Sequence, residues 1–212
     1  MALEQEILKE FETIVGPSNV SAGEVITQCY AYNWCQEIFN YMHDKEPIPF
    51  SDVPKAVLLP STTEEVQQIV KLCNKYKIMV KAQSTGLGPW NQPSSPNSVI
   101  LDLRRMNRIV KIDEKNLYCV VEPYVSGAQL QVEIMKHGLN CHMPGAGPMA
   151  SPLASATSMN GPGFTSPHTG HSSRNMLAVE WVLPDGEILR LGSLGQKNNS
   201  DWFHGDGPGP SL

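Results

Sequence analysis

The first candidate for ligand binding is the stretch QSTGLG at residues 83–88, which follows the apolar run IMV at residues 78–80. Glycine lacks a side chain, so the backbone at Gly86 and Gly88 can come close to a ligand, and successive N–H groups in such a turn can bind an anion. A diphosphate cradle is one interpretation, and a plain turn between two strands is the other. The candidate residues are Gln83, Ser84, Thr85, Gly86, Leu87 and Gly88.

Two common phosphate-binding motifs do not fit this stretch. A Rossmann site needs G-x-G-x-x-G at the start of a helix, whereas Gly86-Leu87-Gly88 is followed by Pro89-Trp90 and no helical pattern. The G-x-x-x-x-G-K-[ST] loop is absent from the sequence. A diphosphate bound here would therefore lie on a loop that follows a strand.

A second candidate is the stretch from residue 143 to residue 175, which is rich in Gly, Pro, Ser and Ala and is predicted to be one long loop. Loops of that length are uncommon inside compact domains and are usually functional. Its small residues would let the backbone approach a ligand, and its N–H groups could form anion-binding nests. The glycine-bearing loops 83–90 and 144–171 could together hold one extended diphosphate ligand.

The histidines are the main candidates for proton transfer. His168 and His171 lie in the second loop, where each could polarise a substrate or simply be a hydrogen-bonded loop residue. His142, beside Met143-Pro144, fits neither interpretation better than the other. The remaining three are predicted to be surface residues: His43, His137 and His204.

No metal site or disulfide framework is indicated. The sequence has 5 cysteines, an odd number, without a C-x-x-C motif, and the histidines show no metal-ligand spacing. We expect reduced, buried thiols in a cytoplasmic protein.

The elements that must position these loops follow an α+β pattern. The apolar residues before Gly16-Pro17 recur at helical spacing, and a second helical stretch is expected at 34–42. Ser61 or Thr62, with Glu64 or Glu65 three residues on, forms a capping box for a helix that buries Val66, Ile69, Val70 and Cys73. Strands are expected at 56–59, 78–82 and 99–103, hairpins at 109–122 and around Pro184-Asp185-Gly186, and a helix at 126–137 before Gly138.

Composition limits the partners. The net charge is -5 and the basic residues are scattered, which argues against nucleic acid. No apolar run approaches the length of a membrane span, and the N-terminus MALEQEILKEF lacks the basic and apolar regions of a secretory signal. We therefore expect a cytoplasmic protein that has no membrane span and does not bind nucleic acid.

Several motifs in a fixed order resemble a known family. PSTTEEV at 60–66, LDLRRMN at 101–107 and VLPDGEIL at 182–189 together resemble the FAD-binding domain of the vanillyl-alcohol oxidase and p-cresol methylhydroxylase (PCMH) superfamily, which includes glycolate and D-lactate dehydrogenase-type flavoproteins. The resemblance runs from about Pro54 to Gly192. It implies a two-part, mixed and antiparallel sheet domain with covering helices at 54–212, incomplete at its C-terminus, after a helical N-terminal extension at 1–53.

The resemblance also implies site residues. In the family, the loop matching residues 83–90 binds the FAD pyrophosphate through backbone N–H groups. Some members attach FAD through a histidine of this loop; no histidine lies between residues 78 and 95, so attachment from the loop is excluded and FAD is expected to bind non-covalently. The second loop is expected to contribute Pro144, Ala154, Ser155, Asn160, Gly163, Gly170 and His171.

Two departures from the family pattern bear on function. Ala154-Ser155 stand near the place where most members have a Gly-Gly pair, and Met159-Asn160 replace an acidic residue and an arginine of the phenol-oxidising branch. Phenol oxidation is therefore not carried over from the resemblance.

The function implied is the FAD-binding part of an oxidoreductase that passes a hydride from a small alcohol or 2-hydroxy acid to flavin. The expected partners are FAD, a small-molecule substrate, and a C-terminal cap domain or second polypeptide that completes the substrate site. The alternative is a non-catalytic flavin-binding or assembly subunit, or a remnant domain, of a larger complex. The residues identify no catalytic group beyond the candidates His168 and His171.

Overall fold

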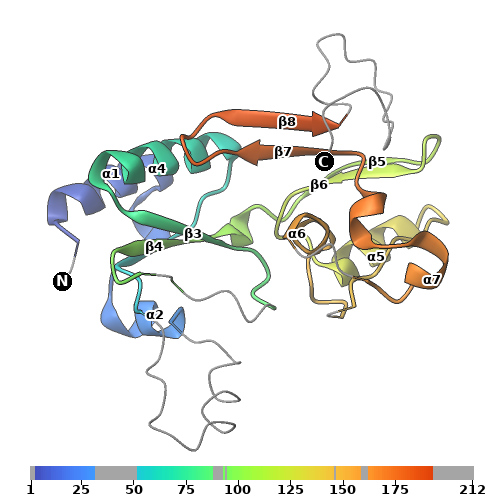
Figure 1. Ribbon diagram of the computed structural model, residues 1–212, viewed down its shortest axis with the longest axis horizontal. Coiled ribbons are helices and arrows are strands. Elements are labelled where there is room, and N and C mark those ends of the chain that lie inside the picture. The colour runs from blue at the N-terminus through green and yellow to red at the C-terminus, as the bar shows by residue number, and fades with distance from the viewer. Residues whose placement is uncertain are drawn as a thin grey trace, which may run out of the picture. The chain divides into compact units, whose positions relative to one another are not determined.

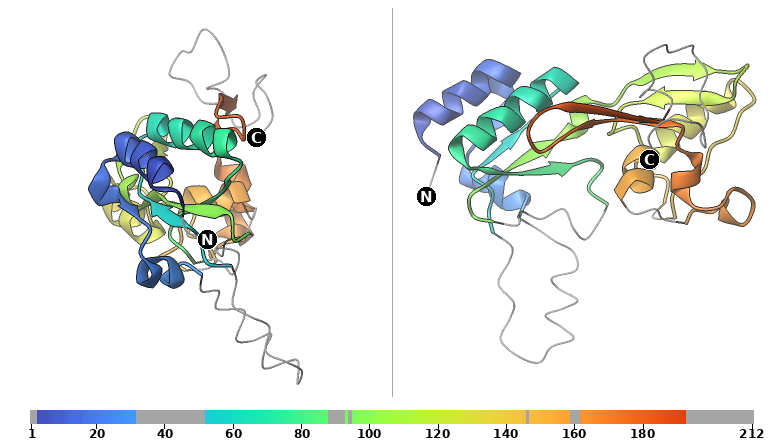
Figure 2. Two further views of the ribbon diagram at one scale, coloured as in Figure 1. Left: turned by 90° about the vertical axis from the view of Figure 1, so that its left-hand side faces the viewer. Right: turned by 45° about the horizontal axis from the view of Figure 1, so that its top comes forward.

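The computed structural model describes residues 3–31, 52–87, 93, 95–145, 147–158 and 162–192. Within it the chain divides after Arg105 into two compact units, and each is described by itself. Figures 1 and 2 show their helices and strands. The α+β class expected from the sequence is confirmed, with small mixed and antiparallel sheets and covering helices.

The first unit is built on a mixed sheet with the strand order β1-β2-β4-β3. Strands β2 and β3 both run parallel to the central strand β4, and β1 runs antiparallel to β2. All residues of β2 and β4 are buried, which is the pattern of parallel strands covered on both faces. The strands are β1 (Val20–Ser21), β2 (Ala56–Leu58), β3 (Met79–Gln83) and β4 (Ser98–Asp102).

Helices α1 and α4 lie beside each other in this unit and share one core (Figure 2). Phe11 of α1 and Ile69 of α4 are both 0% exposed in that core. Helix α4 buries Leu72 in addition to the expected Ile69 and Cys73, whereas Val70 is only half-buried, because residues three and four apart share a helix face. The helical elements are α1 (Gln5–Val15), η1 (Pro17–Asn19), α2 (Glu24–Cys29), α4 (Thr63–Tyr76) and η2 (Leu103–Arg105).

The capping box of α4 uses one of the expected pairings. Thr62 is the N-cap, and its Oγ1 accepts a hydrogen bond from the Glu65 amide at 3.1 Å. The Glu65 carboxylate accepts from the amide of Ser61 at 2.7 Å, one residue earlier than the usual capping box. The first bond satisfies an amide that the first helical turn would otherwise leave without a partner, and the second ties the residue before the N-cap to that turn.

The N-terminal segment belongs to the first unit. It supplies helix α1 to the core and strand β1 to the sheet that residues 52–105 build. It also contains α2, which the periodicity did not predict, while the helix expected at 34–42 lies outside the described residues. The domain boundaries drawn from the sequence, 1–53 and 54–212, stay a prediction.

The second unit contains two antiparallel hairpins and helix α5, and both hairpins expected from the sequence are confirmed. Val125, Leu130 and Ile134 form its small buried core. Gly138 follows the helix with φ of +71°, and the next amide, Leu139, donates to the Ile134 carbonyl at 3.1 Å. The elements are β5 (Ile109–Asp113), β6 (Tyr118–Val121), α5 (Gly127–Met135), β7 (Ala178–Val182) and β8 (Ile188–Gly192).

The expectation of one long loop over 143–175 is wrong. This segment contains α6 (Pro152–Ser158), α7 (Ser166–Thr169) and the 3-10 turn η3 (Ser172–Asn175). Proline at the first position suits a helix start, and the buried Ser151 hydroxyl accepts from the Ala154 amide at 3.3 Å. The alanines and serines that indicated a loop are therefore compatible with short helices.

Replacing Phe11 with alanine tests whether the N-terminal helix is part of the core. We expect the free energy of unfolding to fall by about 3–5 kcal/mol, because the change leaves a cavity in a packed interior. Urea denaturation followed by circular dichroism measures the loss. The matched control is Val25→Ala in the same segment, which trims a side chain that is 76% exposed and should change stability by less than about 0.5 kcal/mol. Equal effects of the two substitutions would show that α1 contributes no core.

Candidate functional site

The first candidate loop leaves the sheet at the carboxyl end of β3. Gln83, the last residue of that strand, pairs in register with Asp102, the last residue of β4. Because β3 and β4 are parallel, their carboxyl ends meet at one edge, which is where ligands bind in open sheets with parallel strands. The pairing therefore places the start of the loop at the edge of the sheet suited to binding.

The described part of this loop contains one glycine in a left-handed conformation. Gly86 has φ of +73°, which favours glycine, and a Cβ there would lie 3.0 Å from Gln83 Nε2. Within the part of the chain that the structure describes, the amides of Gly86 and Leu87 donate to no other group. Ser84 and Thr85 are half-buried and already have partners. Gly88, Pro89 and Trp90 lie outside the described residues.

A buried carboxylate anchors the neighbouring strand end, and the sequence reasoning did not single it out. Asp102 is 1% exposed and accepts from Tyr30 Oη at 2.5 Å and from Arg104 Nε at 2.8 Å. Its other carboxylate oxygen accepts from the Arg104 amide at 3.0 Å. Tyr30 comes from the N-terminal segment, so a contact between residues far apart in sequence holds this edge of the sheet. The sequence signal for this buried carboxylate is an aspartate at the end of a mainly apolar strand.

The second segment is folded onto itself around His142. Pro144 is fully buried and forms an isolated antiparallel bridge with Gly163. His142 Nδ1 lies 2.7 Å from Thr165 Oγ1, and its Nε2 lies 3.0 Å from Ser172 Oγ. The half-buried imidazole, which sequence alone left undecided, thus joins the bridge to residues of α7 and η3.

Gly163 and Gly170 of this segment do not form an open nest for an anion. The Gly163 amide donates to Ser166 Oγ at 2.7 Å, and the Gly170 amide donates to the Ser166 carbonyl at 2.9 Å. A Cβ on Gly163 would lie 2.1 Å from the Met143 carbonyl oxygen and 2.3 Å from His142 Nε2. Glycine at 163 is therefore required by packing within the segment, and a cofactor contact at Gly163 or Gly170 stays a prediction.

The other residues expected in this segment have varied settings. Ala154 and Ser155 are half-buried in α6, where the Ser155 amide donates to the Ser151 carbonyl at 2.9 Å. His168 in α7 and His171 just before η3 are both exposed. Met159 and Asn160 lie outside the described residues. A cofactor contact at any of these positions stays a prediction.

Comparison with known proteins now decides the family. Residues 54–192 match the family model of the FAD binding domain. The chain belongs to this FAD-binding domain family. The resemblance read from the sequence to the PCMH-type domain is thereby confirmed.

Relatives of this FAD-binding domain are flavoproteins and other oxidoreductases of greater length. The chain is 34% identical over 165 residues to the 4-cresol dehydrogenase [hydroxylating] flavoprotein subunit of Pseudomonas putida, covering 75% of this chain and 31% of the relative. It is 27% identical over 198 residues to D-lactate dehydrogenase of Anaerostipes hadrus, covering 93% of this chain and 39% of the relative. The chain thus spans about a third of the length of the relatives it matches.

Solved structures show the same fold. A crystal structure of p-cresol methylhydroxylase with substrate bound has a TM-score of 0.72 and 28% identity, covering 93% of this chain and 37% of that one. The isoeugenol complex of 4-ethylphenol oxidase from Gulosibacter chungangensis has a TM-score of 0.77 and 29% identity, covering 97% of this chain and 38% of that one.

The first loop of this FAD-binding domain fits the diphosphate of FAD. The Gly86 and Leu87 amides are free to donate within the described chain, and the positive φ of Gly86 is typical of nests that bind phosphate oxygens. Helix α6, by contrast, already uses the amides of Ala154 and Ser155 in its own turn. The two loops are thus unequal, and the first is the better candidate for phosphate.

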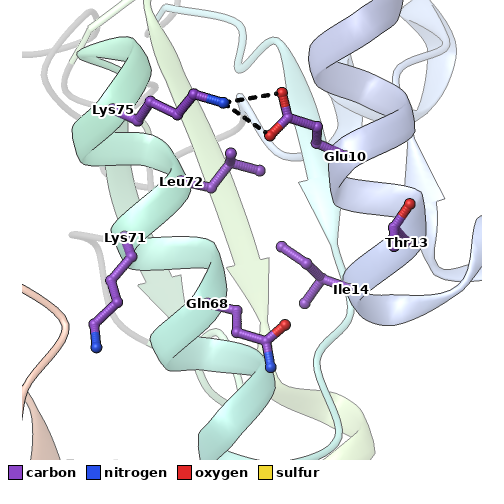
Figure 3. A pocket seen from close by; sticks show the side chains of 7 residues that line it. All are labelled: Glu10, Thr13, Ile14, Gln68, Lys71, Leu72 and Lys75. Atoms are coloured by element: carbon purple, nitrogen blue, oxygen red, sulfur yellow. Dashed lines mark hydrogen bonds and ion pairs between the residues drawn. The ribbon is translucent and has the colours of Figure 1, made fainter.

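A groove between α1 and α4 of the FAD-binding domain is a separate feature (Figure 3). It is lined by Glu10, Thr13, Ile14, Gln68, Lys71, Leu72 and Lys75. Lys75 Nζ lies 3.2 Å from Glu10 and points toward it, and hydrogen bonds from Tyr76 and then Lys75 lower the pKa of Glu10. The groove presents mainly apolar surface beside an ion pair, and we assign no chemistry to it.

The described residues offer neither a metal cluster nor a membrane span. No three His, Cys, Asp or Glu side chains among them gather in a way that could hold an ion. None of the helices in the described ranges combines the length and apolarity needed to cross a bilayer.

The cysteines of the FAD-binding domain differ in exposure. Burial raises the pKa of Cys73 to about 12. Burial, together with the nearby Cys119 thiol, raises the pKa of Cys141 to about 11. Cys29 is exposed, which corrects the expectation of uniformly buried thiols, and Cys35 lies outside the described residues.

These differences predict the order of alkylation. At pH 8 we expect iodoacetamide to modify Cys29 well before Cys73 or Cys141, because the thiolate is the reactive form and a raised pKa keeps the Cys73 and Cys141 thiols protonated. Modification of Cys141 should accelerate as the pH approaches 11, in the order of its pKa. Peptide mass spectrometry over time measures each site, with denatured protein as the control. Equal rates at Cys29 and Cys73 in the folded protein would contradict the structure.

Proposed function

We propose that this FAD-binding domain is the cofactor-binding part of an oxidoreductase that oxidises a small alcohol or 2-hydroxy acid. The observation that carries the proposal is the first loop, whose Gly86 and Leu87 amides are available at the carboxyl edge of a parallel strand pair. The loop contains no histidine, so FAD is held there non-covalently.

The chain's own contribution is to bind and orient the cofactor. The amides of Gly86 and Leu87 donate to diphosphate oxygens, and the anion is stabilised by backbone dipoles without a basic side chain in the loop. Asp102, paired with Arg104 and Tyr30, keeps the strand end beside the loop rigid. FAD, when bound, supplies hydride acceptance at flavin N5.

The substrate class rests on the relatives. D-lactate dehydrogenase of Anaerostipes hadrus and glycolate oxidase subunit GlcD of Bacillus subtilis are named for 2-hydroxy acids. The 4-cresol dehydrogenase subunit is named for a phenol and makes phenols the second candidate. Exposed His168 and His171 are the side chains of this chain that would polarise a substrate hydroxyl.

A partner completes the site in this proposal. The relatives are about three times as long as the matched segment, so a C-terminal cap domain or a second polypeptide supplies the remaining substrate contacts. The alternative is a non-catalytic flavin-binding or assembly subunit. It is favoured by α6, where Ala154 and Ser155 stand near the family's Gly-Gly pair and use their amides internally.

Substitution of Gly86 tests the cradle. We expect Gly86→Ala to weaken FAD binding at least about tenfold, because a side chain strains the left-handed backbone and crowds the amides that face the ligand. Gly16→Ala is the matched control, since Gly16 has φ of +87° in the same unit but lies outside the loop. Titration of flavin fluorescence measures the dissociation constants. A wild-type protein that has no flavin absorption band and takes up no added FAD would refute the proposal.

Substrate class is tested by reduction of the bound flavin. In the complete assembly without oxygen, we expect a 2-hydroxy acid such as D-lactate or glycolate to bleach the flavin band, and 4-cresol to do so more slowly. Stopped-flow absorbance measures the rates. Bleaching by 4-cresol alone would move the enzyme to the phenol branch, and bleaching by none of the panel would favour the non-catalytic alternative.

A further inference from the structure

We propose that His142 is a positioning residue, whose imidazole clamps the segment from Gly163 to Ser172 into the shape that this FAD-binding domain requires. Its ring nitrogens contact three hydroxyl groups that lie 23, 27 and 30 residues further along the chain. The relevance to flavin rests on the proposed function, whereas the clamp itself does not.

The hydroxyl groups around the ring form a complete hydrogen-bond set. Thr165 Oγ1 and Thr169 Oγ1 lie 2.7 Å and 3.1 Å from His142 Nδ1, and Thr169 Oγ1 donates to the Thr165 carbonyl at 3.1 Å, so we assign the ring proton to Nδ1, from which both hydroxyl oxygens can accept. With Nδ1 as the donor, Nε2 becomes the acceptor for the Ser172 hydroxyl at 3.0 Å. Ser172 is 3% exposed, so loss of this acceptor would leave a buried hydroxyl with a poorer network.

The ring is also held by packing. Gly163 leaves the space that the imidazole fills, since a Cβ there would lie 2.3 Å from Nε2. On the neighbouring residues, the Phe164 amide donates to the Met143 carbonyl at 3.1 Å, and the Gly145 amide donates to the Pro162 carbonyl at 3.1 Å. Two backbone hydrogen bonds and the ring therefore join residues 142–145 to residues 162–164.

The contacts of His142 stabilise α7 and η3, two short elements that have little stability of their own. Helix α7 has 4 residues and η3 has 4, below the length at which isolated helices persist. Within the second unit, η3 contacts both α6 and α7, which are labelled in Figure 1. His142 supplies the tertiary contacts that such elements need, so its removal should loosen α7 and η3 together.

The hydrogen bonds also give His142 a different role from His168 and His171. Both nitrogens of His142 are engaged, so it acts through the segment that carries the two exposed histidines and not on a substrate itself. Loosening that segment would alter the surroundings of a bound flavin without removing any group in contact with it.

The test compares His142→Ala, His142→Asn and His142→Gln in the full chain. The asparagine amide reaches the position of Nδ1 and can keep the contact with Thr165, while the glutamine amide reaches the position of Nε2 and can keep the contact with Ser172. The matched control is His137→Ala, which removes an exposed imidazole paired with Glu114 in the same unit.

Amide hydrogen exchange by mass spectrometry gives a readout that needs no cofactor. In His142→Ala we expect the amides of residues 163–175 to exchange about tenfold faster, and those of β5–β6 and β7–β8 to keep their wild-type rates. Asparagine should restore protection mainly in α7, and glutamine mainly in η3. Unchanged exchange in the alanine variant would overturn the clamp.

FAD affinity and the visible spectrum of the bound flavin form the second readout. We expect His142→Ala to weaken FAD binding about tenfold or to shift the flavin spectrum, with partial rescue in the asparagine or glutamine variant. Faster exchange with an unaltered affinity and spectrum would overturn the link to flavin. A wild-type chain that binds no FAD refutes the proposed function, while exchange still decides the clamp.

A second pair of variants covers the case in which His142→Ala does not fold. Thr165→Val and Ser172→Ala each remove one hydroxyl partner and leave the ring in place. Each should accelerate exchange in its own element, α7 or η3. If both leave exchange throughout 163–175 unchanged, the clamp is overturned.

Discussion

The parallel pairing of β4 with both β2 and β3 is the constraint on which the first unit depends. Buried backbone amides and carbonyls must form hydrogen bonds. In β2, β3 and β4 these groups find their partners in the hydrogen bonds between the strands. Once Gln83 is paired with Asp102, the chain can leave β3 only at the carboxyl edge. The amides of Gly86 and Leu87 lie beyond Gln83, the last residue of β3, and therefore take no part in the hydrogen bonds between strands.

The buried carboxylate at this edge of the sheet is stabilised partly by a residue that is distant in the sequence. Asp102 is buried, and an unpaired carboxylate in that position would strongly destabilise the fold. Arg104 supplies a local partner and Tyr30 a distant one, so the N-terminal segment takes part in the edge of the sheet that carries the loop. A segment outside the family match thus contributes to the unit in which the match begins.

Glycine serves two different purposes in the two candidate loops. At Gly86 it permits a left-handed backbone and leaves amides facing outward, which suits an anion. At Gly163 it makes room for the His142 ring and the Met143 carbonyl, and its amide is used by Ser166. Both stretches contain glycine, serine and threonine, but in the first the Gly86 and Leu87 amides have no partner among the described residues, whereas in the second the Gly163 and Gly170 amides donate within the segment.

Much of the fold could be read from the sequence because its signals are local. The Thr62–Glu65 capping interaction and the short polar connections of the two hairpins act within a few residues, and the structure contains each of them. The motif order also indicated the family, since a match to a family model depends on residues along the chain and not on their contacts. The first candidate loop could be proposed for the same reason, as it is one continuous stretch after a strand.

Tertiary structure decided the features that join distant residues. Short helices α6 and α7 were read as loop because Gly, Pro, Ser and Ala carry weak local preferences, and contacts outside the segment stabilise them. His142 could not be interpreted until Thr165 and Ser172 were brought to its ring, and Asp102 until Tyr30 reached its carboxylate. Burial of Leu72 in place of Val70 depended likewise on where α1 packs. Local propensity specifies elements, whereas the packing of buried polar and apolar groups specifies which side chains meet, and that is a property of the folded chain.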